Sequence, residues 1–307
     1  MAESNNNAGV MIGVELSGAV LRGALLSAGG DQIDTVESFI SNEKDTASQL
    51  AEFINNFKTR AAGASSIGIA VPGLLDLKTG RVALSKHSPE HESVDLAQEI
   101  FQGTGLKARL ENDANAAAYA EFKLGAGRGA EDMFYVTLGK GVGGAIILNG
   151  KLRRGASGFA GEFGYVAINS EGLRVEDMAS AENIVRRTKD RLYQDHTTSL
   201  QKIGEEKLTV ADIVAAANAG DDFAIMMLER TGMFVGTGIA GVINLLNIER
   251  IVIGGEVMAA AGDPVLKGIT ERAKTLSFAP GFEETKIVAG ELGVNASAIG
   301  AALLSSE

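Results

Sequence analysis

A strand, a glycine-containing turn and a second strand follow one another twice in this chain, and this repetition is its strongest structural constraint. The first copy lies between residues 11 and 27, around Gly18, and the second between 133 and 149, around the glycines of 139–144. Strands joined by so short a turn pair with each other. Because strands and helical segments alternate after each copy, the sequence predicts two similar α/β halves around a cleft.

Hydrophobic periodicity places the individual elements. The expected strands are 11–15, 20–27, 32–41, 66–71, 107–110, 133–138, 145–149, 151–154, 251–253 and 286–288. The expected helices are 45–62, 95–101, 113–124 and 296–304, with a mostly helical region after residue 174.

The same alternation predicts the domain boundaries. Residues 1–8 are expected to be a disordered tail and 9–123 a smaller N-terminal α/β domain, to which a helix in 294–307 returns. Residues 124–293 are expected to form a larger C-terminal α/β domain. Three glycines of 125–129 form either a hinge between the halves or an ordinary loop.

Charge and composition limit the function classes. The 307 residues carry 28 Lys and Arg against 39 Asp and Glu, a net charge of −11, so a nucleic-acid duplex or an anionic membrane would be repelled overall. Without cysteine the chain has no disulfide, no thiolate nucleophile and no cysteine zinc site. The N-terminus has no signal-peptide pattern. We therefore expect a cytoplasmic protein with neither a membrane nor a nucleic acid as its partner.

One uncharged stretch resembles a membrane span. Residues 231–248 carry no charge but contain four glycines and two asparagines. A helix buried between other elements fits this composition better, and its glycines would let a neighbouring backbone approach closely. The part of this helix near Gly238 is also a candidate homodimer contact.

The glycine run of 139–144, LGKGVGG with its leading leucine, is a candidate anion site. Glycines let backbone N–H groups approach a phosphate, although a tight β-turn without a ligand has the same composition. The run matches G-x-G-x-x-G, but a strand follows it where the dinucleotide fingerprint requires a helix. Rossmann-type binding is therefore disfavoured.

Polar residues at the ends of elements provide the candidate chemistry. Asp113 follows a strand and could accept a proton from a hydroxyl nucleophile, whereas in the alternative Asn112 or Asp113 only caps the next helix. Glu162 and Glu176 lie beside glycines and at a helix start, where carboxylates are also found for purely structural reasons. Gly254-Gly255 ends an apolar strand, a common ligand edge in α/β proteins.

Taken together, and in this order, these segments resemble the ROK family (repressors, open reading frames and kinases). The most specific part is ENDANAAAYAEFKLGAGRGA followed by YVTLGKGVGGAIILNGKLRRGASGFAGEFGY. The resemblance extends from residue 10 to residue 304. It implies the actin-like ATPase fold of sugar kinases and the phosphorylation of a hexose or amino sugar by ATP and Mg²⁺.

The resemblance also implies roles for residues. Asp113 would be the general base, and the sugar would be bound by Gly73, Asn112, Asp113, Glu162, Tyr165 and Glu176. The nucleotide and its phosphates would lie against Glu15, Ser17, Gly18, Gly139, Lys140, Gly141, Gly143, Gly144, Gly254 and Gly255.

The first phosphate loop departs from the family pattern. The family has Asp-x-Gly-Gly-Thr-Lys where this chain has ELSGAV, so the metal-associated Asp is Glu15, and the Thr and Lys are Ala19 and Val20. Lys140 replaces a threonine of the second loop. Its charge either compensates for the lost lysine or points to solvent.

The zinc element of the family is absent as well. Tyr165 stands where the family has a zinc-binding histidine, and no Cys cluster precedes Glu176, so we expect no structural zinc. His87 and His91, separated by Pro89, make an incomplete metal set and more plausibly reshape the substrate lip. We expect no metal ligands among the site residues.

Two hypotheses for function follow, besides a structural relative that binds neither ligand well. The chain is an active ROK-type sugar kinase, or it is a sugar-binding sensor or regulator that has lost catalysis. Direct DNA binding is disfavoured by the charge and by the few residues that precede the first strand.

Overall fold

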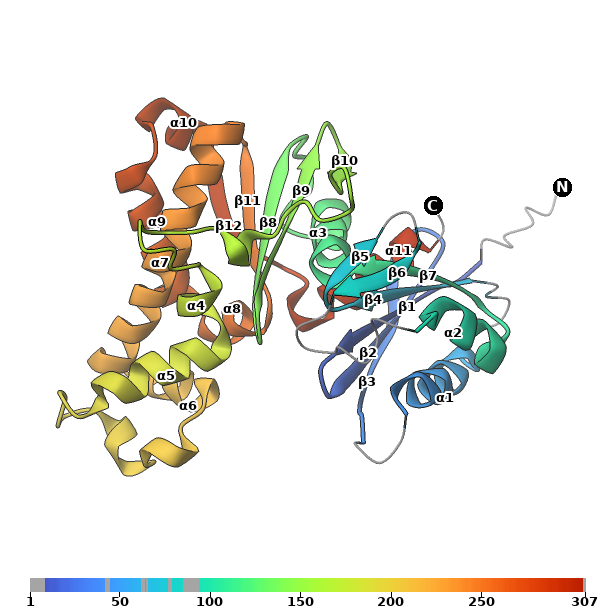
Figure 1. Cartoon of the computed structure of the whole chain (residues 1–307), viewed down its shortest axis with the longest axis horizontal. Coiled ribbons are helices and arrows are strands. Elements are labelled where there is room, and N and C mark those ends of the chain that lie inside the picture. Colours follow the sequence, from blue (N-terminus) through green and yellow to red (C-terminus); the bar gives the residue numbers. More distant parts are fainter. Residues whose placement is uncertain are drawn as a thin grey trace, which may run out of the picture. The chain divides into compact units, whose positions relative to one another are not determined.

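The computed structural model describes residues 9–41, 45–61, 64, 66–76, 79–84 and 94–305. The chain divides into two compact units (Figure 1). Unit 1 comprises Met1–Leu124, Arg154–Ala160 and Asn295–Glu307, and unit 2 comprises Gly125–Arg153 and Gly161–Val294. His87 and His91 lie outside the described residues.

Unit 1 is built on a five-stranded sheet with the order β3-β2-β1-β4-β7. Its strands are β1 Met11–Ser17, β2 Val20–Leu26, β3 Gln32–Phe39, β4 Ser66–Val71 and β7 Lys107–Asn112. β1, β2 and β3 pair antiparallel, whereas β4 and β7 continue the sheet in parallel from β1. A small hairpin, β5 Leu74–Asp76 and β6 Arg81–Leu84, accompanies it.

Helices cover both faces of this sheet. They are α1 Thr46–Lys58, α2 Leu96–Thr104, α3 Asp113–Leu124 and α11 Ala296–Leu304. Phe53 and Phe57 of α1 pack against Gly23 of β2, and α11 packs against Gly13 of β1 on the opposite face. Gly13 pairs with Ala24 and shares its face of the sheet, whereas Gly23, the next residue along β2, points to the opposite face.

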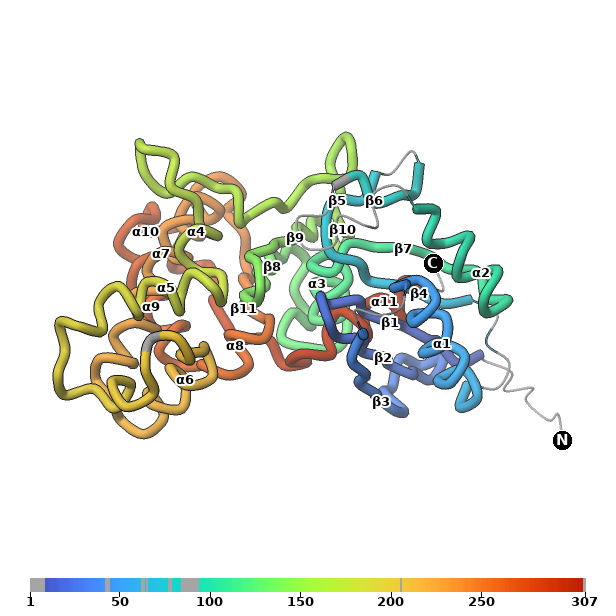
Figure 2. Tube along the Cα trace, turned by 60° about the horizontal axis from the view of Figure 1, so that its bottom comes forward, coloured from blue at the N-terminus to red at the C-terminus, as the bar shows by residue number. Residues whose placement is uncertain are grey.

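Glycines make the contact between α11 and the sheet possible. A Cβ on Gly68 of β4 would lie 1.8 Å from the backbone oxygen of Ala301, so any side chain there would exclude the helix. Gly300 of α11 in turn admits the backbone of α3 at Ala116. Figure 2 shows α11, in red, beside β1 and β4, in blue, although the two segments are at opposite ends of the sequence.

Unit 2 repeats this sheet topology with the order β10-β9-β8-β11-β12. Its strands are β8 Met133–Leu138, β9 Val142–Leu148, β10 Lys151–Arg153, β11 Arg250–Gly254 and β12 Lys286–Ala289. Three antiparallel strands are again followed by two parallel ones. The prediction of two similar α/β halves is confirmed.

The helices of unit 2 form one core with its sheet. They are α4 Glu176–Ala179, α5 Ala181–Leu192, α6 Val210–Asn218, α7 Asp222–Leu246, α8 Glu256–Ala261, α9 Asp263–Leu276 and α10 Ala279–Glu284. Short 3₁₀ turns occur at Phe163–Tyr165, Ser199–Lys202, Glu205–Lys207 and Gly293–Asn295.

Residues 231–246 of the uncharged stretch form the second part of α7, and this helix packs closely against α9. A Cβ on Gly232 would lie 2.1 Å from the Val265 oxygen, and one on Gly268 would lie 2.1 Å from the Glu229 oxygen. The predicted close backbone approach is thus confirmed. Gly238 itself is covered by the ring of Phe163. A homodimer contact of the helix near Gly238 stays a prediction. Within the described residues, no helix combines enough length and apolar character to cross a bilayer.

The turn between β8 and β9 is shorter than the glycine run of 139–144 predicts. β9 begins at Val142 and not at Ala145, because Gly143 and Gly144 pair with Thr137 and Val136 of β8. Only residues 139–141 therefore form the turn. A strand, not a helix, follows it, which confirms that the Rossmann interpretation is wrong for this motif.

Candidate functional site

The carboxyl end of β7 carries the candidate base. The Asn112 side chain donates from Nδ2 to the Gly73 oxygen at 2.9 Å and to Asp113 Oδ1 at 3.1 Å. Its Oδ1 accepts from the Asn115 amide at 3.0 Å. Asn112 therefore caps α3, as the helix-capping interpretation predicts. Gly73 has a positive φ of 105°, a conformation that favours glycine at this turn.

Asp113 is a half-buried carboxylate at the first position of α3. Burial raises its pKa to about 6, although the hydrogen bonds from Ala114 and Asn112 favour its ionised form. The Ala114 amide donates to Oδ1 at 2.8 Å. At neutral pH Asp113 is ionised, with a pKa close enough to 7 for a general base.

Glu111 and Arg154 form a second polar pair that sequence reasoning missed. Glu111 is only 4% exposed, and its Oε2 accepts from Nε and Nη2 of Arg154 at 2.9 and 2.5 Å. The available signal was a carboxylate directly after the predicted strand 107–110, because a charge buried at a strand end requires a partner. Its partner could not be read from the sequence, since Arg154 is distant in the chain.

The turn between β1 and β2 holds the candidate first phosphate loop. Ser17 pairs with Val20, so Gly18 and Ala19 form a two-residue turn in which Gly18 has a φ of 58°. Ser17 and Gly18 are half-buried and Ala19 is exposed.

Glu15, in β1 just before this turn, forms an ion pair with Arg22 of the same unit. It is 7% exposed, and its Oε2 accepts from Arg22 Nη1 at 3.3 Å, while Arg22 Nε also donates to Glu37 at 3.0 Å. Burial raises the pKa of Glu15 to about 7; Arg22 lowers it and the negative charge of Asp113 raises it. A protonatable carboxyl paired with a guanidinium is a poor magnesium ligand.

No group of three or more His, Asp or Glu residues is arranged to hold a metal in the part of the chain that the structure describes. Because its carboxylate is already paired with Arg22, Glu15 is poorly suited to the metal-associated role that the family pattern gives to its position.

The turn of unit 2, residues 139–141, does fit an anion. The Gly139 amide donates to the Gly141 oxygen at 3.0 Å, and the Val142 amide donates to Glu176 Oε2 at 3.1 Å. The amides of Lys140 and Gly141 have no acceptor among the described residues, and the Lys140 side chain is exposed. Two free N–H groups beside a cation suit a phosphate.

Gly143 and Gly144 have a different local role. Both lie inside β9, and Gly144 is buried where a Cβ would be 2.8 Å from the Gly161 oxygen. Packing alone therefore requires a glycine at 144.

The candidate sugar residues of unit 2 are only partly assembled with this turn. Glu176 begins α4 and is brought to the turn by its bond to Val142. Glu162 is exposed and precedes the 3₁₀ turn Phe163–Tyr165. Tyr165 is 50% exposed, with the Arg174 guanidinium 4.6 Å from its ring centre.

Gly254 and Gly255 mark the junction of β11 and α8. A Cβ on Gly254 would lie 2.3 Å from the Tyr135 hydroxyl, and one on Gly255, at φ 89°, would lie 2.4 Å from the Leu138 oxygen. Packing against β8 requires both glycines. Each unit thus holds its own share of the predicted site residues: Glu15, Ser17, Gly18, Gly73, Asn112 and Asp113 in unit 1, and the remainder in unit 2.

Comparisons with known proteins agree with this architecture. Residues 11–307 match the family model described as ROK family. The glucokinase of Thermotoga maritima is 32% identical over 311 residues, covering 97% of this chain and 97% of the relative. The xylose repressor of Bacillus subtilis is 28% identical and covers 96% of this chain but 77% of the repressor.

A solved structure shares the fold over nearly the full length. The ROK family glucokinase of Streptomyces griseus, in complex with glucose and AMPPNP, superposes with a TM-score of 0.84 at 28% identity, covering 97% of this chain and 99% of that one. The two mixed sheets are the halves of the α/β, actin-like fold that the resemblance predicts. Matched by the family model over almost its entire length, and to glucokinases at about 30% identity, the chain belongs to the ROK family.

Proposed function

We propose that this protein transfers the terminal phosphoryl group of ATP to a hydroxyl of a hexose or amino sugar. The observation that carries the proposal is Asp113, a carboxylate at a strand end whose pKa is about 6 and whose neighbour Asn112 is anchored to Gly73. The glucokinase relatives support the substrate class.

In this proposal Asp113 accepts the proton of the sugar hydroxyl as that oxygen attacks the phosphoryl group. Asn112 orients the carboxylate through its bond to Oδ1. Because phosphoryl transfer depends on positioning and charge neutralisation, little covalent chemistry is required of the protein.

The remaining residues bind and orient the substrates. Gly73, Glu162, Tyr165 and Glu176 contact the sugar, and Gly254 and Gly255 adjoin the nucleoside. The open amides of Lys140 and Gly141, with the Lys140 charge, receive phosphate oxygens. Magnesium bound to the nucleotide supplies further neutralisation, and we assign it no ligand from Glu15.

A second candidate is a sugar-binding regulator without catalysis. The bond between Glu15 and Arg22 favours it, because the first turn then offers a neutralised carboxylate, and Ala19 and Val20 provide neither a hydroxyl nor a cation. Losing such donors costs roughly 3 kcal/mol of transition-state stabilisation for each group. A xylose repressor among the relatives is consistent with this alternative.

Calorimetric titration separates the two candidates. Magnesium-ATP is titrated alone and then with glucose, mannose, N-acetylglucosamine, N-acetylmannosamine or fructose. Nucleotide binding that strengthens with one sugar, followed by turnover that Asp113→Ala abolishes, supports the kinase. Sugar binding without nucleotide binding or turnover supports the regulator and rejects the kinase.

A further inference from the structure

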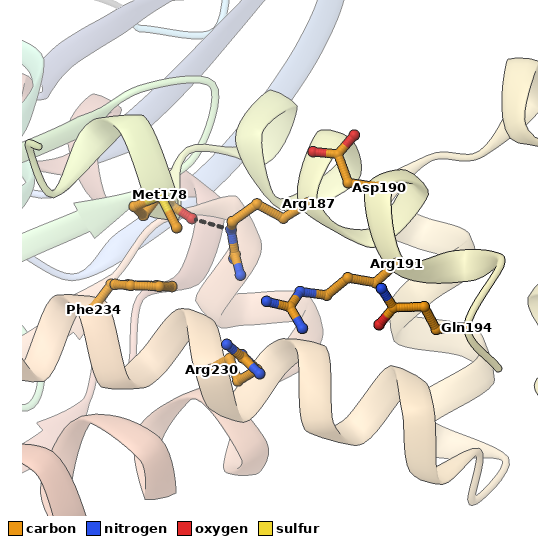
Figure 3. A pocket seen from close by; sticks show the side chains of 7 residues that line it. All are labelled: Met178, Arg187, Asp190, Arg191, Gln194, Arg230 and Phe234. Carbon is orange, nitrogen blue, oxygen red and sulfur yellow. Dashed lines mark hydrogen bonds between the residues drawn. The ribbon is translucent and has the colours of Figure 1, made fainter.

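A small pocket of unit 2, whose lining contains none of the predicted site residues, is lined by three arginines. Its volume is about 290 Å³, and its lining consists of Met178, Arg187, Asp190, Arg191, Gln194, Arg230 and Phe234. Arg187 and Arg191 stand one turn apart on α5, and Arg230 and Phe234 one turn apart on α7. Figure 3 shows the three guanidinium groups pointing toward the same space between these helices.

Hydrogen bonds to neutral oxygens hold Arg187 in place. It is 7% exposed; its Nε donates to the Met178 oxygen at 3.0 Å, and its Nη2 donates to Thr231 Oγ1 at 2.5 Å. Its guanidinium lies 5.2 Å from the ring centre of Phe234. None of these contacts neutralises the charge, so Arg187 is a fixed cation at the wall of the pocket.

The other two arginines are half-buried and without a partner. Neither Arg191 nor Arg230 forms a hydrogen bond or an ion pair with any residue that the structure describes. The nearby carboxylate of Asp190 is paired with Arg186 at 3.4 Å, and in Figure 3 it points away from the three guanidinium groups. The pocket therefore gathers three positive charges and no free negative one.

This arrangement is costly unless an anion joins it. Burial, and after it the charges of Arg230, Arg186 and Arg191, lower the pKa of Arg187 to about 10. The cost arises in a chain whose net charge is −11, so it is a local property and not a general excess of cations. A bound anion would offset both the desolvation and the repulsion.

Guanidinium chemistry selects the kind of anion. The planar N–H fork of arginine matches the oxygens of a phosphoryl group in a two-point contact, and several forks can share one such group. A volume of about 290 Å³ accommodates a phosphoryl group with a small attached moiety. We propose that the pocket formed by Arg187, Arg191 and Arg230 is a binding site for a small molecule bearing a phosphoryl dianion.

The test uses the full chain without sugar or nucleotide, and none of its variants changes a residue of the proposed kinase site. Pyrophosphate and glucose 6-phosphate are each titrated calorimetrically into the wild type, into Arg191→Gln/Arg230→Gln, and into Lys189→Gln/Lys202→Gln. The two lysines do not line the pocket, and their substitution also removes two positive charges from unit 2. Thermal unfolding of the two double variants checks that both fold.

We expect the wild type to bind at least one probe and the arginine pair to weaken binding by about tenfold or more, as the loss of charge-assisted hydrogen bonds predicts. The lysine pair should bind within about twofold of the wild type, because neither lysine lines the pocket. Preference for pyrophosphate identifies an inorganic anion, and preference for glucose 6-phosphate identifies a phosphomonoester. Absence of binding to the wild type, or equal weakening in both pairs, overturns the proposal.

A second measurement needs no variant. Phenylglyoxal modifies accessible arginines, and peptide mass mapping locates the modified positions. The bound probe should protect Arg191 and Arg230 while leaving the exposed Arg153 reactive. Equal modification of Arg191 and Arg230 with and without a saturating probe would also overturn the assignment.

Discussion

Arg154 binds Glu111 through two N–H groups, and through Glu111 it supports the strand end that presents Asp113. The other oxygen of Glu111, Oε1, accepts from the Asn112 amide at 3.1 Å and from Asn115 Nδ2 at 3.0 Å. One buried carboxylate therefore ties a distant arginine to the residues on both sides of the candidate base.

Replacing Arg154 by glutamine should lower the free energy of unfolding by about 3 kcal/mol, because Glu111 is left buried without its cation. Urea unfolding measures the change. Arg153→Gln is the matched control, since the Arg153 side chain is exposed and, among the described residues, bonds only to the Leu148 oxygen. Glu111→Gln/Arg154→Gln should recover part of the loss. Equal stability of the Arg153 and Arg154 variants would contradict this prediction.

Asp113→Asn should reduce kcat by about 10²- to 10⁴-fold, the usual contribution of a general base, while sugar affinity changes much less. A coupled assay of ADP release gives kcat, and calorimetry gives the affinity. Asp263→Asn, an exposed carboxylate at the start of α9, is the control and should leave both unchanged. Retained turnover in Asp113→Asn would remove Asp113 from its catalytic role.

The pH dependence of kcat/KM should report the same group. The pKa of Asp113 is raised to about 6 by burial, and the ionised form is the active base. The rate should therefore be constant above pH 7 and fall about tenfold for each pH unit below 6. Stopped assays in constant-ionic-strength buffers test this; a rate that holds down to pH 4.5 would not fit Asp113 as the base.

The contribution of Asp113 to stability should depend on pH in the opposite sense to the rate. The pKa of Asp113 is about 6 in the folded chain, against an unperturbed value of 3.8 for the unfolded chain, so the folded state binds the proton more tightly. The contribution of Asp113 to the free energy of unfolding should then be greatest below pH 4 and decline by up to about 3 kcal/mol as the pH rises through 6. Glu15 contributes in the same direction. Subtracting the curve of Asp113→Asn from that of the wild type isolates Asp113, and a flat difference would refute its raised pKa.

Two glycines of α7 should respond oppositely to alanine. Gly232→Ala places a Cβ 2.1 Å from the Val265 oxygen and should destabilise by about 2 kcal/mol or more, because α9 must move. Gly241→Ala meets nothing within 4 Å and should stabilise by about 0.5–1 kcal/mol through helix propensity. Thermal unfolding compares them directly, and similar shifts in the two variants would mean that α9 adapts.

The periodicity of the hydrophobic residues and the residue types at the turns predicted most of the fold. Strand 66–71 and helices 113–124 and 296–304 have the predicted bounds, because each has a clear period and a sharp end. The predicted start of β9 at residue 145 was wrong. A run of glycines fits either a turn or a paired strand, and the pairing of 142–144 with β8 determines which one forms.

Partners across the fold were beyond reach of the sequence. The Glu111–Arg154 and Glu15–Arg22 pairs depend on register and on a segment that returns to unit 1. The arginine pocket needs two helices, α5 and α7, in contact, and neither helix reveals it alone. Local patterns give element type; charge partners arise from tertiary placement.

The position of α11 has a consequence for biosynthesis. Gly13 and Gly68 present a bare sheet face on which α11 packs closely, and α11 is made after all of unit 2. At about 5–20 residues per second, the ribosome takes several seconds or more between the two. During that time the nascent N-terminal sheet keeps an uncovered apolar face, and it becomes complete only when the helix emerges and docks.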